Sequence, residues 1–440
     1  LPTNISIEEP LAYKRHPFTK HLSCSVYFNN DAGSRNLTFL EAKHRVWLSD
    51  SDENSLKTDC QSIRSRGYYP ATPLNEIEAA FPLAFVRIVY RVRFVSFTAF
   101  SNFLFHDYFF IETAFRSEYS PQNVFCYVLD SKAEPLFKKK IKDLRNCFPD
   151  NVFIAETEFN VSNSGHNMSV AHLSCLQKIK EEKYEYVFLL QNHDFKMKTN
   201  RELIEILKLF NGANEVSALH PIDETFPKEA NYTFSALRLF KNESKNLERD
   251  PNGQLASLKI AKSFVQVSLT HVAANYILEE LNVDNLIQVL EKATYGVDEN
   301  FIATLNANEA VGLPGGFTHS CLDIQKSYLG ITRWSRWYKS SDCYSNIWRH
   351  NICVFGVEDL AFVRRKRHFF VNKFWPEFDF GAVDCLAERL FNLTYLDGSR
   401  EFSDYNSYKQ LAVVRYNAIK KTNGDLKSFR CVLRKSDRNG

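Results

Sequence analysis

The sequence predicts an α/β fold in which a doubly wound, mostly parallel sheet carries helices on both faces. From about Pro82 onward, short apolar runs alternate with segments of helical periodicity. Strands that are buried on both faces consist of nearly continuous apolar residues, and helices between such strands are typical of a parallel sheet. The 440 residues, 44% of them hydrophobic, can form a core large enough for this fold.

The expected elements follow one another in a regular order. The runs predicted to be strands are 83–90, 123–129, 152–155 and 186–190. The patterns predicted to be helices between or after them are 135–146, 169–182 and 200–210. Further elements expected along the chain are a helical stretch at 270–290, a helix beginning near 301 and a strand-like run at 352–356. Strands that alternate with helices in this way predict the doubly wound arrangement.

Two flanking segments differ from this main domain, which we place at 79–400. Residues 1–78 are polar and irregular and are interpreted as a stem or an N-terminal wrapping segment, and residues 401–440 as a basic tail on the surface. Inside the main domain, residues 92–106 hold five phenylalanines in fifteen positions. The sequence leaves open whether this stretch packs on the core or is an unusual insertion, such as a translated intron.

Charge and cysteine content narrow the classes of function. The 55 basic and 52 acidic residues give a net charge of +3, which provides no strong field for nucleic acid or an anionic membrane. The ten cysteines show no C-x-x-C pair and no zinc-like spacing, so they favour disulfides. The candidate N-glycosylation sites are Asn4, Asn36, Asn160, Asn167, Asn231, Asn242 and Asn392. Together, cysteines and sequons predict an oxidising lumen.

Common signatures of nucleotide, protease and hydrolase sites are absent from the sequence. It contains no P-loop, no G-x-G-x-x-G after a strand, no H-E-x-x-H and no G-x-S-x-G. Its D-x-D motif, residues 50–52, lies in the polar N-terminal segment, where we expect a solvated loop and not a metal site. No uncharged apolar stretch reaches the length of a membrane span. Because none of these motifs indicates a metal or a bound cofactor, we expect neither.

Several motifs together resemble the core-2/I-branching β-1,6-N-acetylglucosaminyltransferases, glycosyltransferase family 14, which are related to the peptide O-xylosyltransferases. The motifs are residues 120–130 (SPQNVFCYVLD) with 147–149 (CFP), 295–305 (YGVDENFIATL), 352–360 (ICVFGVEDL) and 372–374 (NKF). The similarity extends from about 82 to about 396 and is weaker between 212 and 257. It implies a GT-A-like fold and an inverting, metal-independent transfer of GlcNAc from UDP-GlcNAc to a glycan hydroxyl in β-1,6 branching.

The resemblance assigns one residue as the general base and others as ligands of the donor diphosphate. Glu299 matches the general base that takes the proton of the acceptor hydroxyl, whereas the residues alone favour a helix cap at this position. Lys373 matches a lysine that binds the donor diphosphate. His350 stands where the relatives carry an arginine, with Arg349 immediately before it, and the sequence leaves open which of the two binds the diphosphate.

Other residues are assigned to the bound sugars and base. Asp130 matches the aspartate that contacts uridine, and Ile88 and Tyr90 at the end of the first strand either pack on the base or belong to the core. Trp337 matches a tryptophan that stacks on the acceptor sugar, although an ordinary half-buried aromatic is the alternative. Residues 215–235 show no counterpart of the family's charged acceptor loop, so the sequence does not predict the acceptor glycan.

The resemblance also implies a disulfide scheme and a location. The implied pairs are Cys24–Cys385, Cys60–Cys147, Cys126–Cys175 and Cys343–Cys353. Cys321 and Cys431 remain, and whether they pair or stay free is left open. The implied location is the Golgi lumen, as a type II membrane protein whose N-terminal anchor lies outside this chain.

The expected partners are UDP-GlcNAc and a glycan or glycoprotein acceptor, with no nucleic acid. Two alternative functions are retained. One is a peptide O-xylosyltransferase that uses UDP-xylose, because that branch shares the Asp-Glu segment. The other is a secretory binding protein that keeps the fold but has lost transfer, suggested by His350 and by residues 92–106.

Overall fold

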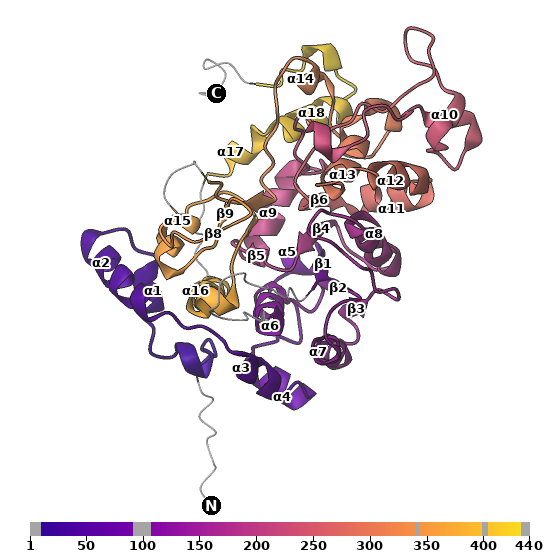
Figure 1. Cartoon of the computed structure of the whole chain (residues 1–440). Helices are drawn as coiled ribbons and strands as arrows, with labels where there is room; N and C mark the ends of the chain where they lie inside the picture. The colour runs from indigo at the N-terminus through magenta and orange to yellow at the C-terminus, as the bar shows by residue number, and fades with distance from the viewer. Residues whose placement is uncertain (1–9, 91–106, 339–342, 398–403, 433–440) are drawn as a thin grey trace, which may run out of the picture.

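The computed structural model describes residues 10–90, 107–338, 343–397 and 404–432. The unusual stretch at 92–106 and the sequon at Asn4 lie outside these ranges. Within them, no helix is both long and apolar enough to cross a membrane. Figure 1 shows the central strands enclosed by helices, with the N-terminal segment running along one side and the C-terminal helices at the opposite end.

The central sheet has five strands in the order β3-β2-β1-β4-β6. The parallel strands are β1 (Leu83–Val89), β2 (Val124–Leu129), β3 (Val152–Ile154) and β4 (Tyr186–Gln191). The edge strand β6 (Val267–Thr270) runs antiparallel to β4 and was not predicted. The predicted mostly parallel α/β sheet is therefore confirmed, and its first four strands form where the apolar runs indicated.

Helices connect and cover these strands. The helices that match the predictions are α7 (Pro135–Cys147), α8 (Met168–Lys178), α9 (Asn200–Phe210) and α13 (Asp298–Ala307). The other helices between β1 and residue 397 are α6 (Asp107–Glu118), α10 (Phe234–Leu237), α11 (His271–Glu279), α12 (Asp284–Leu290), α14 (Ser320–Asp323), α15 (Leu360–Val363) and α16 (Pro376–Phe391). α9 begins after Thr199 because Thr199 and Glu202 form a capping box there.

Alternating side chains of the strands place helices on both faces of the sheet. The ring of Phe125 in β2 packs against Phe115 of α6, with 4.8 Å between ring centroids. The next residue, Cys126, forms a disulfide with Cys175 of α8. Because successive side chains of a strand point to opposite faces, the sheet lies between α6 and α8.

Two small sheets extend the molecule beside the ends of these strands. One contains β5 (Phe195–Lys196), β10 (Phe370–Val371) and β7 (Arg333–Trp334), and the other contains β8 (Trp348–Arg349) and β9 (Ile352–Cys353). Phe370 of β10 packs on Phe188 of β4, with ring centroids 5.1 Å apart. Of the strand predicted at 352–356, only the first two residues form a strand, β9.

The helix expected over 270–290 is wrong as a single element, because the chain forms α11 and α12 with a break between them. Leu281 forms a β-bridge with Phe240, and the backbone N–H of Asn282 donates to the carbonyl of Leu239 at 2.7 Å. These hydrogen bonds to a distant segment replace those that would continue the helix. The apolar pattern of 270–290 carries no signal of that partner.

The N-terminal segment packs along the main domain. Its helices are α1 (Cys24–Tyr27), α2 (Ala32–Glu41), α3 (Asp50–Ser55), α4 (Cys60–Arg66) and α5 (Glu76–Ala79). Disulfides Cys24–Cys385 and Cys60–Cys147 tie it to α16 and α7. Closing long loops in this way restricts the unfolded chain and stabilises the fold by about 3–5 kcal/mol for each bond in the chain-entropy model.

The D-x-D motif at 50–52 is part of α3 and not a solvated loop. The carboxylate of Asp52 accepts hydrogen bonds from the backbone N–H of Ser49, at 2.7 Å, and from its hydroxyl, at 2.6 Å. The hydroxyl of Ser49 in turn accepts from the backbone N–H of Asp52. Asp52 therefore serves as half of a capping box.

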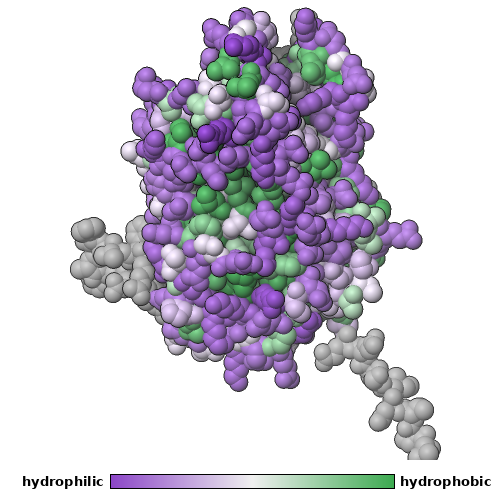
Figure 2. Space-filling view, turned by 90° about the vertical axis from the view of Figure 1, so that its right-hand side faces the viewer, coloured by the Kyte–Doolittle hydropathy of each residue, from purple (hydrophilic) through white to green (hydrophobic). Residues whose placement is uncertain are grey.

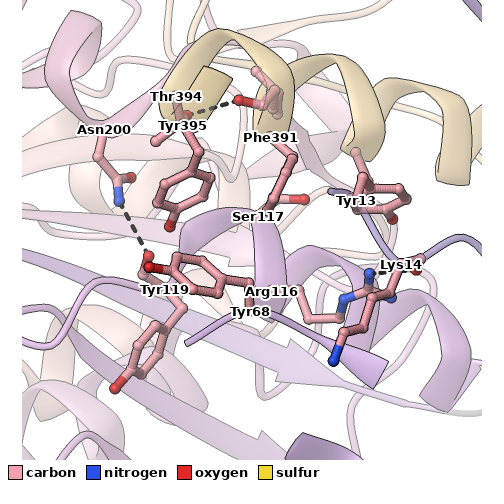
Figure 3. Close-up of a pocket in the computed structure, with 12 residues that line it drawn as sticks. Tyr13, Lys14, Tyr68, Arg116, Ser117, Tyr119, Asn200, Phe391, Thr394 and Tyr395 are labelled. Atoms are coloured by element: carbon pink, nitrogen blue, oxygen red, sulfur yellow. Dashed lines mark hydrogen bonds between the residues drawn. The ribbon is translucent and has the colours of Figure 1, made fainter. Parts of the chain in front are cut away.

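Aromatic side chains fill the contact between the N-terminal segment and α16 together with the residues that follow it, 392–397. Figure 3 shows Tyr13, Tyr68, Phe391 and Tyr395 around a small cavity of about 20 Å³. The ring of Tyr68 meets that of Tyr395 edge-on at 5.0 Å, and Arg116 lies 4.8 Å above the ring of Tyr13. A space of this size holds about one water molecule, so we treat this cavity as a packing feature.

The expectation that the tail after residue 400 lies on the surface is wrong for part of it. Residues 404–432 contain α17 (Asn406–Lys409) and α18 (Ala412–Lys421), and Tyr408 and Tyr416 in these helices are buried. Cys431 pairs with Cys321, which settles the question that the sequence left open. The four disulfides implied by the resemblance are also present, so all ten cysteines are paired.

The surface is mixed in character. Figure 2 shows a face on which hydrophilic residues predominate and hydrophobic residues gather in patches between them. The chain carries 55 basic residues (lysine and arginine) and 52 acidic ones (aspartate and glutamate). This distribution is ordinary for a globular protein and does not mark a partner.

Candidate active site

A cavity of about 630 Å³ lies at the carboxyl ends of β1, β2 and β4, where open parallel sheets bind ligands. The predicted site residues that line it are Tyr90, Asp130, Glu299, Trp337, Arg349, His350 and Lys373. Ile88 does not line it, because its side chain is fully buried inside the sheet. The structure thus brings together residues that are far apart in the sequence and come from the ends of strands, from one helix and from three loops.

Glu299 lies in the first turn of α13 and faces the cavity. Its carboxylate forms an ion pair with the ammonium of Lys262, and its backbone carbonyl accepts from the N–H of Ser263 at 2.7 Å. The side chain makes no capping hydrogen bond to a backbone N–H of α13, whose N-cap position is Val297. A carboxylate that is partly exposed to the cavity and held by a lysine can accept a proton from a bound hydroxyl.

Asp298 is the second carboxyl group at this end of the cavity. Burial, together with the nearby charge of Glu299, raises the pKa of Asp298 to about 7. Gly165 packs directly against it, because a Cβ on Gly165 would lie 2.0 Å from Asp298 Oδ1. Gly165 also has φ of +93°, so this close approach requires a glycine.

We expect the titration of Asp298 to make stability depend on pH. In the unfolded chain Asp298 loses its proton near the ordinary value of 3.8, whereas in the folded protein it holds the proton up to about pH 7. The folded state therefore binds more protons between these values, and its stability falls as the pH rises through them. Asp298→Asn, which resembles the protonated acid, should remove this part of the decline.

Urea unfolding of both proteins at about pH 5 and about pH 8 measures the effect. The wild type should lose more stability than Asp298→Asn between the two conditions. Equal losses would show that Asp298 does not titrate in this range.

Positively charged and basic residues, Arg349, His350 and Lys373, also line the cavity. The guanidinium of Arg349 lies 4.7 Å above the ring of Trp375. Burial, together with the nearby charges of Arg349 and Arg333, lowers the pKa of Lys373 to about 7. Burial, with the charges of Lys373 and Arg349, also lowers the pKa of His350. A cluster of cations that depress each other's pKa is suited to bind an anion, whose charge would relieve their repulsion.

Asp130 and Tyr90 lie at the ends of β2 and β1. The carboxylate of Asp130 accepts from the backbone N–H of Lys132 at 3.1 Å and pairs with its ammonium at 3.1 Å. The ring of Tyr90 meets that of His193 edge-on at 6.2 Å. These groups offer an aromatic face and a hydrogen-bonding carboxylate on one side of the cavity.

Trp337 lies at the edge of the cavity, and 41% of its surface is exposed. Its ring is nearly parallel to that of Phe264, with 6.3 Å between centroids and 21° between planes. Exposed aromatic faces of this kind bind the apolar face of a sugar.

The cavity contains residues that the sequence interpretation missed. Those that line the cavity are Lys132, the loop at 160–165, Gln191, His193, Arg333 and Asn372. Lys262 does not line it but forms an ion pair with Glu299, which does. The polar residues 191–194 follow a buried strand, and this position was a usable signal. Arg333 and Lys262 gave no such signal, because their places in the site depend on contacts with distant segments.

Comparison with known proteins places these features in a family. The sequence model described as Core-2/I-Branching enzyme matches residues 98–364, which is more than half of the chain. The chain is 31% identical over 367 residues to the N-acetyllactosaminide beta-1,6-N-acetylglucosaminyl-transferase of Homo sapiens, a match that covers 79% of this chain and 84% of that protein.

Two further relatives carry similar names. The chain is 28% identical to Beta-1,3-galactosyl-O-glycosyl-glycoprotein beta-1,6-N-acetylglucosaminyltransferase 3 of Rattus norvegicus, over 80% of this chain and 78% of that protein. It is 26% identical to the Beta-1,3-galactosyl-O-glycosyl-glycoprotein beta-1,6-N-acetylglucosaminyltransferase of Bovine herpesvirus 4, over 85% of this chain and 83% of that protein. The chain therefore belongs to the core-2/I-branching family and is a glycosyltransferase.

Proposed function

We propose that the enzyme transfers GlcNAc from UDP-GlcNAc to a glycan hydroxyl with inversion, forming a β-1,6 branch, and that it needs no metal. The observation that carries the proposal is that Glu299 lines the same cavity as Lys373 and Arg349. A base and a set of cations in one cavity are the two requirements of transfer from a sugar diphosphate. The names of the relatives support GlcNAc as the sugar and β-1,6 as the linkage.

In this mechanism Glu299 accepts the proton of the acceptor hydroxyl as its oxygen forms a bond to the anomeric carbon. The bond between that carbon and the phosphate oxygen breaks, and its electron pair leaves with UDP. Lys373 and Arg349 stabilise the charge that grows on the leaving diphosphate. Lys262, paired with Glu299, holds the carboxylate in place.

Arg349, and not His350, is proposed as the permanent charge beside Lys373. Arginine stays protonated at any physiological pH. The lowered pKa of His350 leaves its ring neutral at neutral pH, so it can donate a hydrogen bond but adds no charge. Asp130 and Tyr90 are proposed to bind the uridine, and Trp337 to stack on the acceptor sugar.

The proposed location is the lumen of the Golgi, with an N-terminal anchor that precedes this chain, as in a type II membrane protein. All ten cysteines are paired, and disulfides in such number are typical of oxidising compartments. The sequons at Asn36, Asn231 and Asn242 are exposed and accessible to glycosylation, whereas Asn160 is exposed but lines the cavity.

A transfer assay tests the proposed function. Purified enzyme is given UDP-GlcNAc or UDP-xylose, with N-acetyllactosamine, a β-1,3-galactosyl O-glycan or a serine peptide as acceptor. We expect transfer of GlcNAc to a glycan. Transfer of xylose to the peptide would instead assign the enzyme to the xylosyltransferases, and failure to bind or use either donor would favour an inactive binding protein.

Independence from metal is a separate prediction. Because Lys373 and Arg349 carry the charge that a divalent ion would otherwise supply, turnover in excess EDTA should equal turnover in added Mn²⁺. The comparison uses enzyme that has been dialysed against chelator. Loss of activity in EDTA that Mn²⁺ restores would contradict the prediction.

A further inference from the structure

Arg333 of β7 lines the cavity and is held in one orientation by three neighbours. Its Nε donates to the hydroxyl of Ser335 at 2.6 Å, and its Nη1 donates to Gln266 Oε1 at 2.9 Å. The guanidinium lies 5.0 Å from the centre of the Phe264 ring. Only 8% of the residue is exposed. The head group is therefore fixed before any ligand arrives.

The third nitrogen of this guanidinium, Nη2, is buried and has no hydrogen-bond partner among the described residues. A buried N–H group without a partner is costly, and a charged one more so. Nε and Nη1 each already donate one hydrogen bond, to Ser335 and to Gln266. Nη2 is the nitrogen that donates none to the described residues, so it remains available to a ligand in the cavity.

The charges around Arg333 do not balance without a ligand. Arg333, Arg349 and Lys373 all line the cavity. The buried carboxylate near them is that of Asp194, which already accepts from Asn372 at 2.9 Å and from Gln266 at 2.9 Å. The other carboxylate that acts on Arg333, that of Glu299, is already paired with Lys262. Asp194 alone does not balance three cations, so this part of the cavity is complementary to an anion.

Arg333 interacts electrostatically with both the acidic and the basic residues of the cavity. Burial lowers its pKa, while the charges of Asp194 and Glu299 act in the opposite direction. The charge of Arg333 in turn lowers the pKa of Lys373. It therefore interacts electrostatically with both the proposed base and the diphosphate-binding lysine, and in the proposed mechanism the phosphate attached to the transferred sugar lies between these two groups.

We propose that Arg333 is a third cation of the donor site and that its Nη2 binds an oxygen of the phosphate that carries the sugar. This inference rests on the proposed UDP-sugar donor. When the bond between the anomeric carbon and the phosphate oxygen breaks, its electron pair remains on that phosphate. A fixed arginine donor at this position stabilises the charge as it develops.

The test compares the binding of UDP and UMP, because UMP lacks the phosphate that Arg333 contacts. Arg333→Met keeps the unbranched stem that packs on Phe264 but removes the charge, and Arg333→Gln also keeps a polar end toward Ser335 and Gln266. Arg336→Met is the matched control, since Arg336 is similarly buried, lies three residues away and does not line the cavity. Calorimetry gives the affinities and thermal unfolding reports stability.

Both Arg333 variants should bind UDP about 10- to 100-fold more weakly while binding UMP nearly as the wild type does. Arg336→Met should keep the wild-type ratio of UDP to UMP affinity. An unchanged ratio in either soluble Arg333 variant would overturn the inference, and so would an equal loss for both ligands, which indicates a structural role. If the wild type binds no UDP, the proposed function itself fails.

Discussion

Glu299→Gln is expected to lower the turnover number by about 10²–10⁴-fold. Glutamine fills the same space and its amide oxygen can still accept from Lys262, but it cannot take a proton from the acceptor at neutral pH. Because Glu299 acts on the acceptor and not on the diphosphate, affinity for UDP-GlcNAc should change by less than about twofold. Steady-state kinetics and calorimetry measure the two quantities.

Glu309→Gln is the matched control for this substitution. Glu309 follows the other end of α13, accepts from the hydroxyl of Tyr416 at 2.7 Å and lies outside the cavity. It should alter stability slightly and turnover hardly at all. If Glu299→Gln behaves like this control, Glu299 is a structural residue and the proposed mechanism loses its base.

Lys373→Met is expected to weaken UDP-GlcNAc binding by about 10- to 100-fold and to lower turnover as well. The lysine contacts the diphosphate both before and during transfer, so its loss affects binding and rate together. This distinguishes it from Glu299→Gln, in which rate alone should fall.

Lys373 should also set the pH dependence of donor binding. Its pKa of about 7 in the free enzyme means that it loses its charge as the pH rises above neutrality. A diphosphate stabilises the charged form, so affinity for UDP-GlcNAc in the wild type should decline above about pH 7, by up to about tenfold per unit.

Two variants check the origin of that decline. Lys373→Met should abolish it, whereas His350→Asn should retain it, because the lowered pKa of His350 places its titration below this range. A wild-type affinity that stays constant between about pH 7 and about pH 9 would contradict the assignment of Lys373.

The parts of the fold that could be predicted are those encoded by local sequence. β2 is a continuous apolar run, and β1 is one apart from Arg87, because both faces of these strands are buried; α9 carries its own capping box. The break between α11 and α12 could not be predicted, since it depends on a hydrogen bond from Asn282 to the carbonyl of Leu239 and on the β-bridge between Leu281 and Phe240, about forty residues apart in the sequence.

The same distinction holds for the site. Glu299 and Lys373 lie in motifs that resemble those of a known family, so they could be named from the sequence. Arg333 belongs to the site because it contacts Gln266 and Phe264 of a distant segment. Lys262 belongs to it because it forms an ion pair with Glu299. Cys321–Cys431 is of the same kind, since tertiary packing of the C-terminal helices brings its partners together.

The central claim is that one cavity combines a base with a metal-free diphosphate site to transfer GlcNAc with inversion. The measurement that tests it most directly is the structure of the product formed from UDP-GlcNAc and a glycan acceptor in EDTA, determined by proton NMR. The account predicts a new GlcNAc in β-1,6 linkage, because a hydroxyl activated by Glu299 attacks the face opposite to the departing UDP. A product in α linkage would contradict the account.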